Sequence, residues 1–265
     1  MASQPVKFGP LPPEVRDQSD EPVSAVVRQF TQEELDLGAL RGKVEDNLAV
    51  RLMHGYRLGL QTLLRFRLDD WAPKEDELSS FVPTFGQALS YFTDEDLSLL
   101  SEYQKPTIII RPPRKTYQDL VGALACHYGP GTQTGPVVED RNSLDWESDD
   151  LFRPYIAEAI CNITPKHDLL SQPLGGRMGR RYELRKPSEC GMNSRLYMLL
   201  AMQSIVRGQI IDQKNYTILD GDPIVADRYA AKGECHKGQP SIEWIPLEDP
   251  GGTRGRFRRV LRGTK

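Results

Sequence analysis

The chain has 265 residues, of which 38 % are hydrophobic and 27 % charged, and its formal net charge is −3 at pH 7. This composition is ordinary for a soluble globular protein, and the length allows one large domain or two lobes. No stretch approaches the ~20 apolar residues of a membrane span, and the first residues, MASQPVKFGPLPPEV, lack the basic and apolar regions of a secretory signal. We therefore expect a cytoplasmic protein that does not associate with membranes, with a virus particle as the alternative location.

Charge is unevenly distributed along the chain. Residues 1–150 hold 25 acidic and 15 basic residues, whereas residues 151–265 hold 12 acidic and 19 basic residues. An acidic half joined to a basic half predicts a charged partner or head-to-tail contact between copies, and hence a homo-oligomer or a larger assembly. The alternative is that each half simply has its own solvated surface.

The first half is expected to be an arm followed by an acidic helical lobe. Residues 1–30 are rich in proline and polar residues, which predicts an extended or disordered arm. The lobe at 31–128 begins with a capping box at 31–34 and contains the longest helical pattern, at 44–68. Its other predicted elements are a short helix capped by Thr93, an apolar strand at 107–110 and a helix at 116–127.

The second half is expected to be a linker loop at 129–150, a basic α+β lobe at 151–250 and a basic tail at 251–265. The elements predicted in the lobe are a helix at 152–162, a glycine- and arginine-rich loop at 171–191, a core helix at 194–207 capped by Asn193, and short strands at 216–219, 224–226 and 242–245. The sequence thus predicts an α+β fold that is predominantly α-helical, with two lobes, short strands, a flexible Pro-rich N-terminal arm and a flexible Arg/Gly-rich C-terminal tail.

The tail has the most distinctive chemistry. Its sequence, GGTRGRFRRVLRGTK, contains five arginines, one lysine and no acidic residue. Guanidinium groups bind phosphates through paired hydrogen bonds, and an aromatic ring between them can stack on an exposed base. The residues of the tail that we predict to bind nucleic acid are Arg254, Arg256, Phe257, Arg258, Arg259 and Arg262.

A second cationic cluster lies in PLGGRMGRRYELRK, residues 173–186. Its spacing matches neither of the glycine motifs that bind nucleotide phosphates, so no nucleotide cofactor is expected. Arg177, Arg180 and Arg181 are expected to join the tail in one positive surface that binds phosphates. The alternative is a mobile surface loop.

These features favour a non-enzymatic structural or assembly protein that associates with nucleic acid, RNA in preference to DNA, such as a component of a viral nucleoprotein particle. The alternative without nucleic acid is a protein–protein adaptor whose tail docks on the acidic half.

The alternative from another class is a cysteine hydrolase or transferase. Cys190 precedes a predicted helix, and the N-terminus of a helix lowers the pKa of a thiol. His236 would be the base, and Glu243 would orient it.

No metal is expected. The four cysteines include no CxxC pair, which predicts reduced thiols. The dipeptides Cys126-His127 and Cys235-His236 lack the paired spacing of a zinc site. Asp220 and Asp222 lie between glycine and proline, which favours a turn over a Mg²⁺ site.

Overall fold

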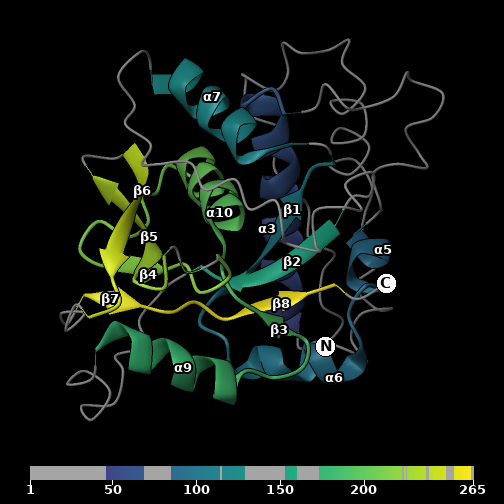
Figure 1. The fold of residues 1–265 in the computed structure, drawn as a ribbon. Helices are drawn as coiled ribbons and strands as arrows, with labels where there is room; N and C mark the ends of the chain where they lie inside the picture. Colours follow the sequence, from purple (N-terminus) through teal and green to yellow (C-terminus); the bar gives the residue numbers. More distant parts are fainter. Residues whose placement is uncertain are drawn as a thin grey trace.

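The computed structural model describes residues 46–68, 85–113, 115–128, 153–159, 173–222, 224, 226–236, 239–248 and 254–263. Within these residues it has six α-helices, one short 3₁₀ helix and eight strands in two four-stranded sheets (Figure 1). The fold is therefore mixed α+β, and the prediction of a predominantly helical protein is wrong. The predicted arm, the capping box at 31–34 and the predicted linker loop lie outside the described residues.

The helices of the first half follow their periodic patterns. The segment with the longest apolar stripe forms α3 (Asp46–Arg65), and a Thr93 capping box begins α6 (Asp94–Ser98). Helix α7 (Tyr117–Tyr128) confirms the prediction at 116–127. The additional short helices are α5 (Phe85–Leu89) and the 3₁₀ helix η3 (Leu99–Glu102).

Sheet A is antiparallel and has the order β1-β2-β8-β3. Its strands are β1 (Pro106–Arg111), β2 (Arg153–Glu158), β3 (Glu189–Cys190) and β8 (Val260–Arg262). Strand β1 confirms the prediction at 107–110. Strand β2 corrects the predicted helix at 152–162: five of its six residues are buried, and a run buried on both faces lacks the alternation that marks a strand.

The C-terminal segment belongs to both sheets, which corrects the prediction of a flexible tail. Strand β7 (Gly255–Arg256) lies parallel to a strand of sheet B, and β8 is an interior strand of sheet A. Val260 and Leu261 are fully buried. Burial of each such side chain contributes roughly 1.5–3 kcal/mol, which offsets the entropy lost when the segment is ordered.

Sheet B has the order β6-β5-β4-β7. Its other strands are β4 (Tyr216–Ile218), β5 (Tyr229–His236) and β6 (Gln239–Pro246). Strands β4 and β6 confirm the predictions at 216–219 and 242–245. The strand predicted at 224–226 is wrong, because Ile224 is exposed and Ala226 adopts a left-handed φ of 51° in a turn.

Helix α9 (Leu174–Leu184) occupies the segment predicted to be a glycine-rich loop. Glycine disfavours a helix by about 1 kcal/mol per residue. However, Leu174 and Met178 are four residues apart and bury together against a small apolar cluster on sheet B. Burial of this face therefore outweighs the low helix propensity of the glycines.

Helix α10 (Ser194–Val206) is the central element of the fold. Its Asn193 cap accepts the Leu196 N–H at 2.9 Å, as predicted. The helix packs against α3, α7, β1 and sheet B (Figure 1), and its Gln203 donates to the carbonyls of Gly55 at 2.8 Å and Ile108 at 3.0 Å. One hydrophobic core thus includes side chains from both predicted lobes.

Candidate functional site

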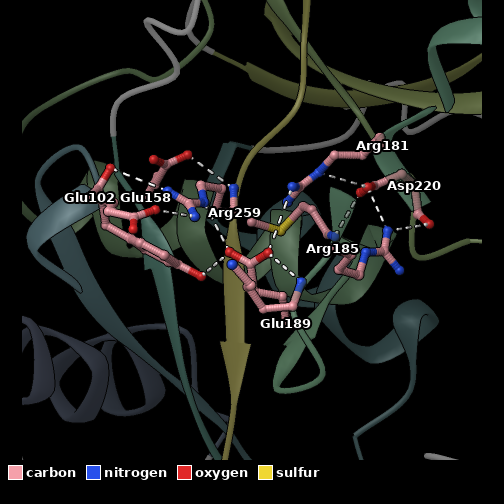
Figure 2. Close-up of polar contacts among 10 residues, drawn as sticks. Glu102, Glu158, Arg181, Arg185, Glu189, Asp220 and Arg259 are labelled. Atoms are coloured by element: carbon pink, nitrogen blue, oxygen red, sulfur yellow. Dashed lines mark hydrogen bonds and ion pairs between the residues drawn. The ribbon is translucent and has the colours of Figure 1, made fainter. Parts of the chain in front are cut away.

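Several arginines predicted to bind nucleic acid are paired inside the molecule. Figure 2 shows a cluster that we call the carboxylate–arginine network, consisting of Glu102, Glu158, Arg181, Arg185, Glu189, Asp220 and Arg259. The Arg259 side chain donates to Glu189 at 2.9 Å and to Glu102 at 2.8 Å. Arg181 lies 3.8 Å from Glu189 and 3.7 Å from Asp220. The two predicted cationic segments do meet here, but they meet around carboxylates.

Burial and hydrogen bonding act in opposite directions on the carboxylates of the network. Burial by itself raises the pKa of Glu189, but hydrogen bonds from a backbone N–H and a tyrosine hydroxyl, with the charge of Arg259, bring that pKa below its ordinary value. For Asp220, burial prevails, and the pKa is raised although Arg185 lies 2.7 Å away. The three arginine side chains are only 14–17 % exposed. The network therefore offers little cationic surface to a polyanion.

Arg258 lies deepest of the predicted arginines and is 1 % exposed. Its Nε donates to Thr217 Oγ1 at 2.8 Å and its Nη2 to Asp212 Oδ1 at 2.7 Å. Its Nη1 donates to the Glu158 carbonyl at 2.7 Å. Because Thr217 belongs to sheet B and Glu158 to sheet A, Arg258 joins the two sheets.

The remaining predicted residues divide by exposure. Arg177 is 3 % exposed and donates to the Gly255 carbonyl at 2.8 Å. Its guanidinium lies 6.0 Å from the centre of the Phe257 ring, which packs on the small apolar cluster of sheet B. Arg256 and Arg262 are half-buried, whereas Arg180 and Arg254 are exposed.

The structure does not bring Cys190, His236 and Glu243 together. Glu243 pairs with Lys232 across the β5–β6 ladder, at 3.0 Å, and His236 lies four residues further along β5, about 13 Å at ~3.3 Å per residue. The residue after Cys190 packs on the backbone just beyond β4, at the end of sheet B opposite to His236. Neither His236 nor Glu243 therefore lies where it could act on the Cys190 thiol.

Asp220 and Asp222, which the sequence favours as turn residues over Mg²⁺ ligands, accept hydrogen bonds from backbone groups. Asp220 accepts the Met192 N–H at 3.1 Å, and Asp222 accepts the Ser194 N–H at 2.9 Å, so both acids fix the chain at the start of α10. Among the described residues, no group of three or more His, Cys, Asp or Glu side chains is arranged to hold a metal ion. Cys161 lies outside these residues.

Apart from Arg258, which also lines the larger one, a different set of cations lines two adjoining cavities, which we call the cationic cleft. Their volumes are about 780 Å³ and about 210 Å³, and both are lined by Lys105 and Arg207. Arg51 also lines the smaller cavity, and Lys214 also lines the larger one. These four exposed residues come from different elements: α3, the residue before β1, the C-cap of α10 and the loop before β4.

The cations of the cleft have no carboxylate partner among the residues that the structure describes. Within the part of the chain that the structure describes, none of the four forms an ion pair with a carboxylate. Asp212 lines the larger cavity, but its carboxylate is paired with Arg258 at 2.7 Å. Burial lowers the pKa of the nearby His54, and the charges of Arg207 and Arg57 lower it further. The cleft is therefore a region of positive potential.

Sequence analysis does not single out the cleft, because each of its cations stands alone in the chain and no motif connects them. In the structure, the backbone of Lys105 is distinctive, because its φ of 47° is left-handed. Such a conformation in a residue with a side chain is strained by roughly 1 kcal/mol or more. It places Lys105 where the two cavities join.

Among the described residues, no helix combines the length and the apolar character needed to cross a bilayer. Comparisons of the chain with protein-family models, curated proteins and solved structures found no match.

Proposed function

We propose that the protein associates with nucleic acid, RNA in preference to DNA, as a non-enzymatic structural or assembly component, and that it binds phosphates in the cationic cleft. The observation that carries the proposal is the set of four cations, Arg51, Lys105, Arg207 and Lys214, that line adjoining cavities without carboxylate partners in the described chain. In the carboxylate–arginine network, by contrast, acids of the same molecule already neutralise the arginines.

Cations that gather at a concave surface favour a polyanion for two reasons. Their mutual repulsion is relieved when a negative charge lies between them. In addition, each phosphate that they neutralise releases counterions condensed on the nucleic acid, so binding weakens as salt concentration rises.

The proposal is tested by fluorescence anisotropy with a mixed-sequence single-stranded RNA between ~50 and ~200 mM salt, where phosphate contacts determine affinity. We expect the double variant Arg51→Gln/Arg207→Gln to bind more weakly. We also expect the slope of log K against log salt to fall by about 1.4, which is ~0.7 for each lost contact to a single strand. A duplex DNA of the same sequence shows which nucleic acid is preferred.

The matched control is Arg180→Gln/Arg254→Gln, which removes the same charge from exposed arginines of the segments predicted from sequence. We expect this variant to retain most of the affinity. If the control variant loses binding while the cleft variant does not, the contact lies on the predicted basic segments instead. If the unchanged protein does not bind RNA or DNA at ~50 mM salt, the proposed function is wrong.

A further inference from the structure

The smaller cavity of the cationic cleft has the size and charge of a phosphate site. Its volume is about 210 Å³, well above the space that one water molecule needs. That space accommodates a phosphate group. Three cations, Arg51, Lys105 and Arg207, line it, together with Pro106 and Thr107.

The charge of the smaller cavity favours a terminal phosphate. A phosphodiester within a strand has one negative charge, whereas a phosphate monoester has roughly −1.5 to −2 at pH 7. Because the three lining cations have no carboxylate partner among the described residues, a monoester neutralises more of their charge than a diester does.

The larger cavity offers a different set of groups. Its volume of about 780 Å³ lies within the ~300–1,000 Å³ range of small-molecule sites. Ile210 and Ile211 provide an apolar wall, and Ile210 is 43 % exposed. The amides of Gln209, Gln213 and Asn215 line the same cavity, and an amide can donate to and accept from the edge of a base. These are the groups that a sugar and a base require, beside the cavity suited to a phosphate.

We infer that the cationic cleft binds one nucleoside monophosphate, with the phosphate in the smaller cavity and the nucleoside in the larger one. Lys105 and Arg207 line both cavities. They therefore contact the phosphate where it joins the nucleoside. The ligand is either a free nucleotide or the 5′-phosphorylated end of a strand. In the second form, the inference rests on the proposed function.

Calorimetric titration with AMP, adenosine and inorganic phosphate tests the inference. We expect AMP to bind at least about tenfold more tightly than adenosine or phosphate, since it occupies both cavities. Arg51→Gln should weaken the binding of both AMP and phosphate by about tenfold. Ile210→Ala should weaken the binding of AMP and leave the binding of phosphate unchanged. Arg254→Gln is the matched control and should change neither the binding of AMP nor the binding of phosphate. AMP binding no tighter than phosphate, or equal effects of Arg51→Gln and Arg254→Gln, would overturn the inference.

The imidazole of His54 provides a second readout that does not depend on affinity. Burial lowers the pKa of His54, and the charge of Arg207 lowers it further. A phosphate against Arg207 offsets that charge, so saturating AMP should raise the pKa of His54 in a proton NMR titration. The pKa of His127, which burial and Arg65 lower, serves as an internal reference and should not change. A constant His54 pKa at saturating AMP would contradict the phosphate position.

Two RNA strands of one sequence, with and without a 5′-phosphate, separate this inference from the proposed function. If the protein prefers the phosphorylated strand and Arg51→Gln abolishes that preference, the result supports both the inference and the proposed function. AMP binding in the cleft without RNA binding supports the inference and overturns the proposed function. RNA binding that needs the cleft cations, without AMP binding or a preference for the 5′-phosphate, overturns the inference alone.

Discussion

Arg258 is a cation that the fold removes from solvent, although its sequence context, RGRFRRVLR, presents it as one of a run of exposed charges. Each of its three nitrogen atoms donates to a different partner, at 2.7 to 2.8 Å. These partners belong to sheet A, sheet B and the loop after α10. The residue therefore contributes to the fold rather than to a binding surface.

Replacing Arg258 should destabilise the whole protein. In Arg258→Ala, the buried Asp212 carboxylate loses its ion pair, and two buried oxygens lose a donor. We expect a loss of about 3–5 kcal/mol in the free energy of unfolding, measured by urea denaturation. Arg258→Lys should recover little of this stability, because one ammonium group cannot donate in the three directions of the planar guanidinium. The exposed control Arg254→Ala should change stability by less than ~0.5 kcal/mol, and a comparably small effect of Arg258→Ala would contradict this role.

The same residues show which part of the candidate site is readable from sequence. The two runs of arginines are visible in the sequence, whereas their meeting in space is seen only in the structure. The acids that neutralise them, Glu102, Glu189 and Asp220, come from distant segments, and no local pattern connects them to the arginines. The cations of the cleft present the opposite case, because each is isolated in sequence and only the fold brings them together.

At the scale of elements, the contact between α3 and β1 depends on small residues. A Cβ atom at Gly55 would lie 2.5 Å from Thr107 Oγ1 and 2.8 Å from the backbone nitrogen of Ile108. The backbone of a buried strand cannot move aside without disturbing sheet A. The close approach also allows Gln203 of α10 to reach the Gly55 carbonyl.

Gly55→Ala should therefore lower the free energy of unfolding by roughly 1–3 kcal/mol through overpacking. The matched control is Gly122→Ala on α7, where nothing lies within 4 Å of an added Cβ. At that exposed position alanine should stabilise the helix by roughly 0.5–1 kcal/mol. Thermal denaturation of both variants checks the prediction. A melting temperature that moves in the same direction in both variants would contradict it.

The elements that the sequence predicts correctly are those with a clear period and a cap. Helices α3, α7 and α10 have apolar stripes or polar caps that survive in the structure. Strand β2 and helix α9 are predicted wrongly for physical reasons: β2 is buried on both faces, and α9 is stabilised by packing that its glycines do not suggest. In both cases tertiary burial decides a structure that local propensity leaves open.

At the scale of the whole molecule, some of the opposite charges of the two halves pair with each other within one chain. The ion pair between Glu102 and Arg259 connects the acidic half to the basic half within one chain. Exposed charges such as Arg180 and Arg254 lie at the surface, and contacts between copies through such charges are the basis for predicting a homo-oligomer.

Such contacts should be sensitive to salt. Light scattering coupled to size exclusion should give a multiple of the monomer mass at ~0.1 M salt and a lower mass at ~1 M salt, because the Debye length falls from about 10 Å to about 3 Å. Arg254→Glu should reduce the oligomer further without unfolding the protein. A monomer at both salt concentrations would rule out assembly through these charges.

The position of β8 between β2 and β3 has a consequence for synthesis. Sheet A joins residues 106–111 to residues 260–262, so it cannot be completed until translation has passed the arginine-rich segment. A nascent chain that stops earlier leaves two strand edges open, and open edges invite pairing with other chains. Removing residues 251–265 would therefore produce an aggregating polypeptide rather than a folded protein that has lost a phosphate contact.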